Sequence, residues 1–328
     1  MFSFNYAEGA TLVMPWLASI AILAFLFIHN EFARRFKWVG LLSFTALPLI
    51  LTIVWMTVLK EDTYTDWFHI AKVYSCTIAA LGFWFIRHYE KKDKITGKVI
   101  WKLSDKKWAL AFPPLILVIN ILEAVARDFE IGNMYWLINS GAIEGEVTGV
   151  MGGMWNYMNG AAGILNIIAI TGWFGIVIRR LTKKDKSKDM LWPDMLWFWI
   201  VAYDLWNFAY TYNCIPSHSW YAGIPMLIAP TLCAFTLGKG AWLQHRAQTL
   251  AIWCMFAQTF PSFQDEGMFK VVSTYNPTIY TFVSAIALIA NIALVAFMVY
   301  KAVSTKRNPY KGELYFDTKA YKKIKELS

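Results

Sequence analysis

The chain has 328 residues, of which 57% are hydrophobic and only 16% are charged. Soluble domains carry roughly 25% charged residues, so this composition excludes an ordinary water-soluble fold. The formal net charge of +9 would suit a nucleic-acid-binding protein, so the positions of the cations must decide that question.

Apolar runs of about 20 residues alternate with short polar blocks along the whole chain. A helix of that length crosses roughly 30 Å of hydrocarbon. The expected fold is therefore all-α, a polytopic membrane helix bundle over residues 1–303 followed by a basic tail over residues 304–328. In chain order, the nine predicted spans lie near residues 10–29, 38–59, 67–87, 108–127, 155–178, 192–212, 220–238, 240–261 and 278–300.

Most lysines and arginines lie in alternate connections, above all 87–107, 179–188 and the segment from residue 301 onward. Cytoplasmic loops retain Lys and Arg, so this distribution predicts an external N-terminus and a cytoplasmic C-terminus. It also argues against nucleic acid, because no recognised binding module accompanies the basic residues. The expected partners are the membrane and its lipids. A homo-oligomer is compatible with the sequence but not specified by it.

Several kinds of chemistry have no motif in this sequence. There is no phosphate-binding lysine loop, dinucleotide-binding glycine pattern, zinc-binding His-Glu-x-x-His pair or haem-attachment motif, and the four cysteines lack metal-like spacing. We therefore expect no cofactor. The glycine-rich connection over residues 129–154 could be a lid, a re-entrant segment or a plain surface loop, and the sequence leaves this open.

Polar side chains recur at helical spacing inside five of the predicted spans. Such groups are costly in a membrane and mark functional sites by default. They are His69, Lys72 and Cys76; Asn120, Glu123 and Arg127; Asn156, Asn159 and Asn166; Asp204, Asn207 and Thr211; and His245 with Arg246.

Depth along the helices indicates which of these groups could meet. With a rise of roughly 1.5 Å per residue from tryptophans taken as interfacial anchors, the polar groups of the third to sixth helices fall in the outer half of the bilayer. We therefore predict a polar chamber between those four helices. Measured in the same way from Trp242 or Gly240, His245 and Arg246 lie near the inner surface and outside the chamber. His218, in the Ser217-His218-Ser219 turn, is expected to be solvated.

Two carboxyl groups, Glu123 and Asp204, are the predicted acid and base, because burial and nearby cations shift carboxyl pKa values in opposite directions. His69 and Tyr203 are further proton carriers. A purely structural interpretation remains open, in which Lys72 pairs with Glu123 or Asp204 and the asparagines join helices.

Five segments together resemble a family of bacterial integral-membrane proteins of unknown function, and the resemblance covers nearly the whole chain. These segments are KVYS at 72–75, FPPLILVINILEAVARDF at 112–129, WNYMNGAAGILNI at 155–167, LWPDMLWFWIVAYDLWNFAY at 191–210 and KGAWLQHRAQTLA at 239–251. Some similar sequences are labelled membrane-bound linoleate isomerases. The resemblance thus implies an enzyme of the bacterial cytoplasmic membrane that converts a free unsaturated fatty acid to its conjugated isomer, without redox turnover.

A fatty-acid substrate needs a cation for its carboxylate, and Lys72, Arg127 and Arg246 are the predicted candidates. Asn120, Asn159, Asn207 and Tyr203 would supply further polar contacts in the chamber. The alternative function is a secondary transporter or proton-coupled carrier that uses the same chamber as its binding site.

Overall fold

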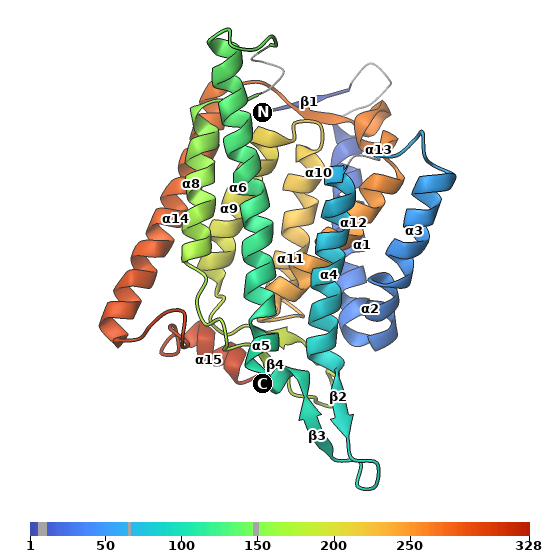
Figure 1. Cartoon of the computed structure of the whole chain (residues 1–328), viewed down its shortest axis with the longest axis vertical. Helices are drawn as coiled ribbons and strands as arrows, with labels where there is room; N and C mark the ends of the chain where they lie inside the picture. The colour runs from blue at the N-terminus through green and yellow to red at the C-terminus, as the bar shows by residue number, and fades with distance from the viewer. Residues whose placement is uncertain (6–11, 65–66, 147–150) are drawn as a thin grey trace.

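The computed structural model describes residues 1–5, 12–64, 67–146 and 151–328. Its helices run mostly parallel or antiparallel to one another as a single bundle (Figure 1). They are α1 (Val13–Arg35), α2 (Lys37–Ser43), α3 (Ala46–Thr57), α4 (Trp67–His88), α5 (Lys107–Leu110), α6 (Phe112–Asn139), α8 (Met154–Ile168), α9 (Trp197–Cys214), α10 (Ser219–Gly223), α11 (Pro225–Phe235), α12 (Trp242–Thr259), α13 (Ser262–Asp265), α14 (Pro277–Thr305) and α15 (Lys319–Lys325).

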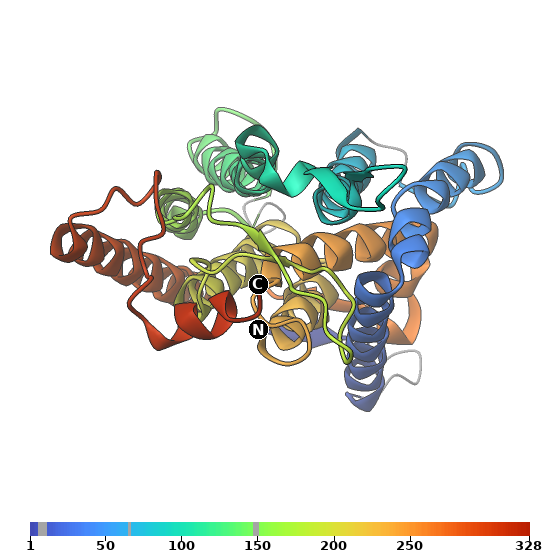
Figure 2. The same ribbon diagram turned by 90° about the horizontal axis from the view of Figure 1, so that it is seen from below.

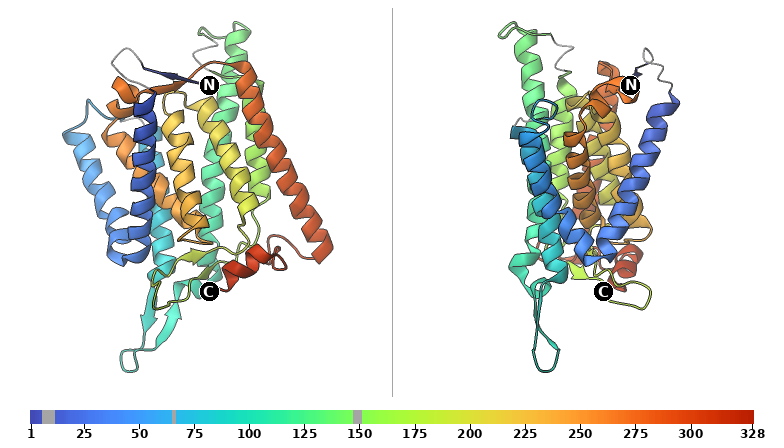
Figure 3. Two further views of the ribbon diagram at one scale, coloured as in Figure 1. Left: turned by 180° about the vertical axis from the view of Figure 1, so that it is seen from behind. Right: turned by 90° about the vertical axis from the view of Figure 1, so that its right-hand side faces the viewer.

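Three short antiparallel strand pairs lie at the two ends of the bundle. At one end, which we call the β1 end, β1 (Phe2–Phe4) pairs with β6 (Val271–Ser273). At the opposite end, the hairpin end, β2 (Glu90–Lys92) pairs with β3 (Val99–Lys102) and β4 (Val177–Ile178) pairs with β5 (Met190–Leu191). The two chain termini lie at these opposite ends (Figure 3).

Five helical segments in the described part of the chain are long and apolar enough to cross a membrane: Val13–Arg35, Lys37–Thr57, His69–His88, Lys107–Asn139 and Pro277–Thr305. Large apolar side chains such as Ile20, Ile53 and Ile289 are about two-thirds exposed on these helices. An unpartnered apolar surface of this kind suits lipid rather than water. The predicted helical, multi-pass membrane character is confirmed at this level.

The other helices lie mainly inside the bundle. Viewed from the hairpin end, α9, α11 and α12 lie between α14 on one side and α1–α3 on the other (Figure 2). Most residues of α9 and α12 are buried. Because protein surrounds these helices, they can carry polar side chains that a lipid-facing helix would not tolerate.

Several predicted boundaries were wrong. The helix predicted to end at residue 127 continues in α6 to Asn139, so the first part of the 129–154 connection is helical, and residues 147–150 of that connection lie outside the described part. The span predicted over 155–178 ends at Ile168. Beyond it, residues 169–196 form a largely buried, non-helical layer across the hairpin end, in which Gly172 has a φ of 63°.

Asp189, fully buried in this layer, holds the hairpin end together. Its carboxylate accepts hydrogen bonds from Arg34 Nε at 3.0 Å and Nη2 at 2.8 Å, from Arg179 Nε at 3.0 Å and from Gln244 Nε2 at 3.1 Å. Burial opposes ionisation, but Arg34 and Arg87 outweigh it and lower the pKa of the Asp189 carboxyl. One side chain, directly before β5, thus joins α1, the residue that follows β4 and the first turn of α12.

The basic tail packs against the same end. Asp194, which is 2% exposed, accepts hydrogen bonds from the backbone N–H groups of Leu314 at 2.8 Å and Tyr315 at 2.9 Å. Leu314 and Tyr315 are themselves buried in the main hydrophobic core. The segment from residue 306 to α15 therefore closes the bundle at the hairpin end.

We expect Asp189→Asn to lower the stability of the fold by about 3 to 5 kcal/mol, because the change removes the fully buried counter-charge that Arg34, Arg87 and Arg179 share. Thermal unfolding in detergent would show a lower Tm. Asp185→Asn is the matched control, since Asp185 also binds Arg34, at 2.5 Å, but its side chain is 24% exposed. Equal losses in both variants would contradict the central role of Asp189.

Candidate functional site

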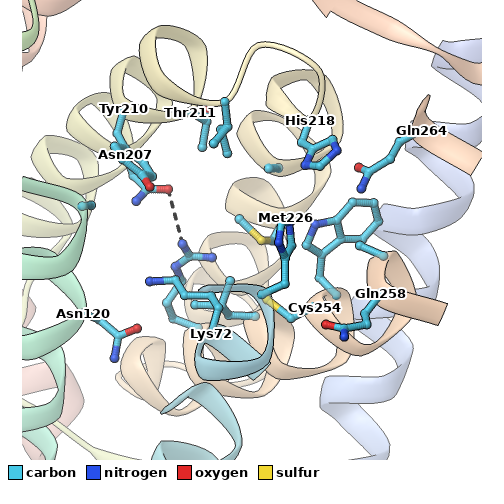
Figure 4. Close-up of a pocket in the computed structure, with 18 of the residues that line it drawn as sticks. Lys72, Asn120, Asn207, Tyr210, Thr211, His218, Met226, Cys254, Gln258 and Gln264 are labelled. Carbon is cyan, nitrogen blue, oxygen red and sulfur yellow. Dashed lines mark hydrogen bonds between the residues drawn. The ribbon is translucent and has the colours of Figure 1, made fainter. Parts of the chain in front are cut away.

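A polar chamber of about 140 Å³ lies within the bundle, enclosed by α4, α6, α9, α10, α11 and α12 (Figure 4). The residues that line it include two cations and no carboxylate. Its polar lining consists of Tyr64, His69, Lys72, Asn120, Tyr203, Asn207, Tyr210, Thr211, His218, Arg246, Cys254, Gln258 and Gln264, and aliphatic and aromatic side chains such as Leu250 and Trp253 complete it.

A wider vestibule of about 960 Å³ adjoins the chamber. Its walls come from one face of α4, one face of α6, the segment 215–218, Asp265 and Lys270. His69, Lys72, Ile215 and His218 line both cavities, so these four residues mark the passage between them. Because the vestibule adjoins the chamber here, the entrance of the chamber lies between α4 and α6, in the half of the bundle nearer the β1 end.

An ion pair joins α4 and α6 beside this passage. Lys72 Nζ donates to Glu123 Oε2 at 2.6 Å, with 21% and 36% of the two side chains exposed. This is one of the two pairings that the sequence left open. Lys72 faces both cavities, whereas Glu123 lines the vestibule.

Arg127 also lines the vestibule and not the chamber. Its Nη1 donates to Glu130 Oε2 at 2.6 Å in a largely exposed pair. Its charge is therefore already neutralised at the surface.

Arg246 is the cation deepest in the chamber, and it is only 5% exposed. Its Nε donates to the Tyr203 hydroxyl at 3.2 Å, and its Nη2 donates to Asn207 Oδ1 at 3.3 Å. Its Nη1 is buried without a hydrogen-bond partner among the described residues. Two neutral oxygens thus accept hydrogen bonds from only some of the N–H groups of this buried guanidinium group. Within the described ranges, Arg246 forms no ion pair.

The expected position of Arg246 outside the chamber was wrong, and the reason lies in the depth marker. Trp242 was taken as an interfacial anchor, but it is 2% exposed and donates to Thr231 Oγ1 at 3.1 Å. The layer formed by residues 169–196 covers the start of α12, which places Arg246 well inside the molecule. His245, also expected near the surface, is fully buried.

A group of side chains at the passage was not predicted from the sequence. His218 Nε2 lies 3.0 Å from Asp265 Oδ1 and 3.1 Å from the Tyr64 hydroxyl, which also donates to Asp265 Oδ2. The rings of Tyr64 and His69 stack with centroids 4.3 Å apart. Burial opposes ionisation of Asp265, but hydrogen bonds from His218 and Tyr64 lower the pKa of its carboxyl.

These residues come from three distant parts of the chain, so no local spacing pattern could have connected them. His218, predicted to be solvated, lies instead in the wall of both cavities. Two histidines and a carboxylate at one passage can hold and transfer protons.

Two predicted site residues lie elsewhere. Asp204 accepts a hydrogen bond from Thr231 Oγ1 of α11 at 2.8 Å and is not part of the chamber wall. Asn159 Nδ2 donates to Asp128 Oδ2 at 2.7 Å, and Asn156 and Cys214 bind Oδ1 of the same carboxyl. Asp128 therefore joins α6, α8 and α9, a contact that was not predicted because the span was expected to end at residue 127.

Of the ten predicted site residues, His69, Lys72, Asn120, Tyr203, Asn207 and Arg246 line the chamber, Glu123 and Arg127 line the vestibule, and Asn159 and Asp204 line neither. Within the residues described, no group of three or more His, Cys, Asp or Glu side chains could hold a metal ion.

Residues 9–327 match a family of unknown function, DUF5692. The chain belongs to this family. The predicted resemblance to an uncharacterised family is thereby confirmed over nearly the whole chain. No curated protein and no solved structure matches it.

We expect Arg246→Met to leave the Tm unchanged or to raise it, because a buried cation that forms no ion pair among the described residues costs desolvation energy that methionine avoids. Arg127→Met is the control at an exposed ion pair and should change the Tm little. A marked fall in Tm for Arg246→Met alone would show that Arg246 serves the fold rather than a ligand.

Proposed function

We propose that this protein crosses a bacterial cytoplasmic membrane nine times, with the hairpin end in the cytoplasm. The five apolar segments supply five crossings, and α8, α9, α10–α11 and α12, which extend beside them, supply four more (Figure 1). The Lys-rich hairpin and tail at one end support this orientation under the positive-inside rule.

A single cysteine in place of exposed Lys94, in the turn between β2 and β3, tests the orientation. A membrane-impermeant maleimide added to intact spheroplasts should leave this thiol unlabelled and should label it after lysis. A cysteine in place of exposed Gly141, just beyond α6, serves as the external control and should react in intact spheroplasts. The reverse pattern would overturn the orientation.

We further propose that the chamber binds a free unsaturated fatty acid and shifts one of its double bonds into conjugation. The observation that carries this proposal is Arg246, a buried cation with an unused N–H group in a chamber whose wall contains no carboxylate. A substrate carboxylate would supply the missing counter-charge through a charge-assisted hydrogen bond.

The length of the chamber, though not its volume, matches an acyl chain that starts at Arg246. From Arg246, the helix rise of about 1.5 Å per residue places Trp253 about 10 Å and Ala257 about 16 Å along α12. An extended chain advances about 1.3 Å per bond, by analogy with the 3.8 Å that three backbone bonds span, so carbons nine to thirteen reach that level. Tyr64 lies there too, because Gln258 Nε2 donates to its backbone carbonyl at 2.6 Å.

The acyl chain then needs more room than the chamber offers. A cavity of about 150 Å³ holds one benzene molecule, so the chamber, at about 140 Å³, takes only part of a long chain. The rest would extend through the passage into the vestibule between α4 and α6. Membrane lipid could exchange with the vestibule from the side.

The chemistry of this proposal is a proton shift. A base removes a proton from the methylene group between two double bonds, the electron pair moves along the chain, and a proton returns two carbons away. The products balance without an oxidant or reductant. His69 and His218 are the proposed proton carriers, with Asp265 orienting His218, and Glu123 is a further carboxyl group at the vestibule.

Protein in detergent supplied with linoleate should generate the ultraviolet absorbance of a conjugated diene. Arg246→Gln should raise KM about tenfold or more, whereas Arg246→Lys should retain part of the activity, since it keeps the charge. His218→Asn should lower kcat, and Glu123→Gln should have a smaller effect. Arg127→Gln, which removes an exposed cation that is already paired, is the control and should behave as the unmodified protein.

Absence of diene from properly folded protein, across lipid and redox conditions, would refute the isomerase proposal. Equal effects of Arg246→Gln and Arg127→Gln would refute the assigned position of the carboxylate.

One observation favours transport as a second candidate. A smaller pocket of about 30 Å³ contacts Arg246 and Asn120 and continues between α4, α6 and α12 toward Phe83 and Leu243. Vestibule, chamber and this pocket together form a series of cavities along the bundle, as an alternating-access path requires. Counterflow of a labelled monocarboxylate into proteoliposomes, with no diene formed, would favour this function over isomerisation.

A further inference from the structure

A separate pocket of about 520 Å³ lies at the hairpin end, between the last turn of α4, the β2–β3 hairpin and the segment 178–188. The chamber contacts α4 near its start, at His69 and Lys72, whereas this pocket contacts its last turn, at Arg87. Six cationic side chains line it, against one acidic side chain, Glu90. The cations are Arg87, Lys92, Lys102, Arg179, Arg180 and Lys188.

Arg87 gives this pocket a buried donor without an acceptor. The residue is 3% exposed, and its Nε donates to the Lys188 carbonyl at 3.1 Å. Its Nη2 donates to the carbonyls of Arg34 at 2.9 Å and Ser187 at 2.7 Å. Three backbone carbonyls thus fix the guanidinium group, while its Nη1 is buried with no hydrogen-bond partner in the described part of the chain.

The acids nearby do not balance the charge of the pocket. Glu90 is already shared by Lys188 at 2.9 Å and Lys92 at 3.5 Å. Asp189 lies 3.9 Å from Arg87 Nη2, but its oxygens accept the closer hydrogen bonds from Arg34 and Arg179. Lys102 and Arg180 are both exposed and form no ion pair within the described ranges.

We propose that this pocket binds a phosphate group, with Arg87 as its fixed donor and Lys102 and Arg180 as its mobile counter-charges. Arginine forks and several converging cations match the multiple acceptor oxygens of a phosphate. Basic pockets at the cytoplasmic side of membrane helices bind phospholipid headgroups by this chemistry, and a soluble phosphate would use the same donors. The pocket is large enough for an esterified phosphate.

The experiment separates these two sources. The full-length protein in a neutral detergent is unfolded thermally in potassium phosphate and in potassium chloride of equal ionic strength. In parallel, native mass spectrometry records the lipid retained from mixed micelles of phosphatidylglycerol and phosphatidylcholine. The test variant is Lys102→Gln with Arg180→Gln, which keeps the structural Arg87, and the control is Lys183→Gln with Lys184→Gln, which removes two exposed charges outside the pocket wall.

We expect the unmodified and control proteins to bind phosphate or phosphatidylglycerol, and the Lys102→Gln/Arg180→Gln variant to lose this binding. A phosphate-specific rise of a few degrees in Tm, absent from the test variant, would identify a soluble phosphate. One retained phosphatidylglycerol, with at least a tenfold lower occupancy in the test variant, would identify a lipid headgroup. No preference for phosphate or phosphatidylglycerol over chloride and phosphatidylcholine, or an equal loss in the control variant, would overturn the proposal.

Discussion

The buried carboxylate of Asp189 is the constraint on which the arrangement of this molecule depends. Arg34 and Arg179 approach it from α1 and from the layer below the bundle, and Gln244 approaches it from α12. Such a network is costly to desolvate, so it forms only when every partner is in place. Since Gln244 lies two residues before Arg246, the same network sets the position at which α12 begins and hence the depth of Arg246 in the chamber.

The chamber is tolerated in an apolar bundle because its polar walls come largely from inner helices. α9 and α12 contribute Asn207, Tyr203 and Arg246 and are covered by neighbouring helices over most of their surface. The lipid-facing helices α4 and α6 contribute polar groups on one face only. Both cations of the chamber are thus gathered at one place, as expected where a ligand is handled, while Asp128 and Asp204 find hydrogen-bond partners on neighbouring helices outside it.

The sequence predicted the features that arise from local pattern. The lengths of the apolar runs predicted the helices that are long enough to cross a membrane. The helical spacing of polar residues predicted that Lys72 and Asn120 line the same cavity, as they do. It could not predict contacts that depend on how distant segments meet, such as Tyr64 with His218 and Asp265. The depth estimated from the helix rise was also wrong for Arg246, because Trp242, taken as an interfacial anchor, is buried. Composition alone does not show which helices the rest of the bundle encloses.

The way Asp194 holds the tail has a consequence for biosynthesis. Every helix up to α14 is made before residues 314 and 315, whose N–H groups donate to this buried carboxyl group. Until they emerge from the ribosome, the inserted bundle exposes an unsatisfied polar group and an apolar surface where Leu314 and Tyr315 will pack. A chain truncated before residue 314 would keep this apolar surface exposed, and quality-control proteases could recognise it there.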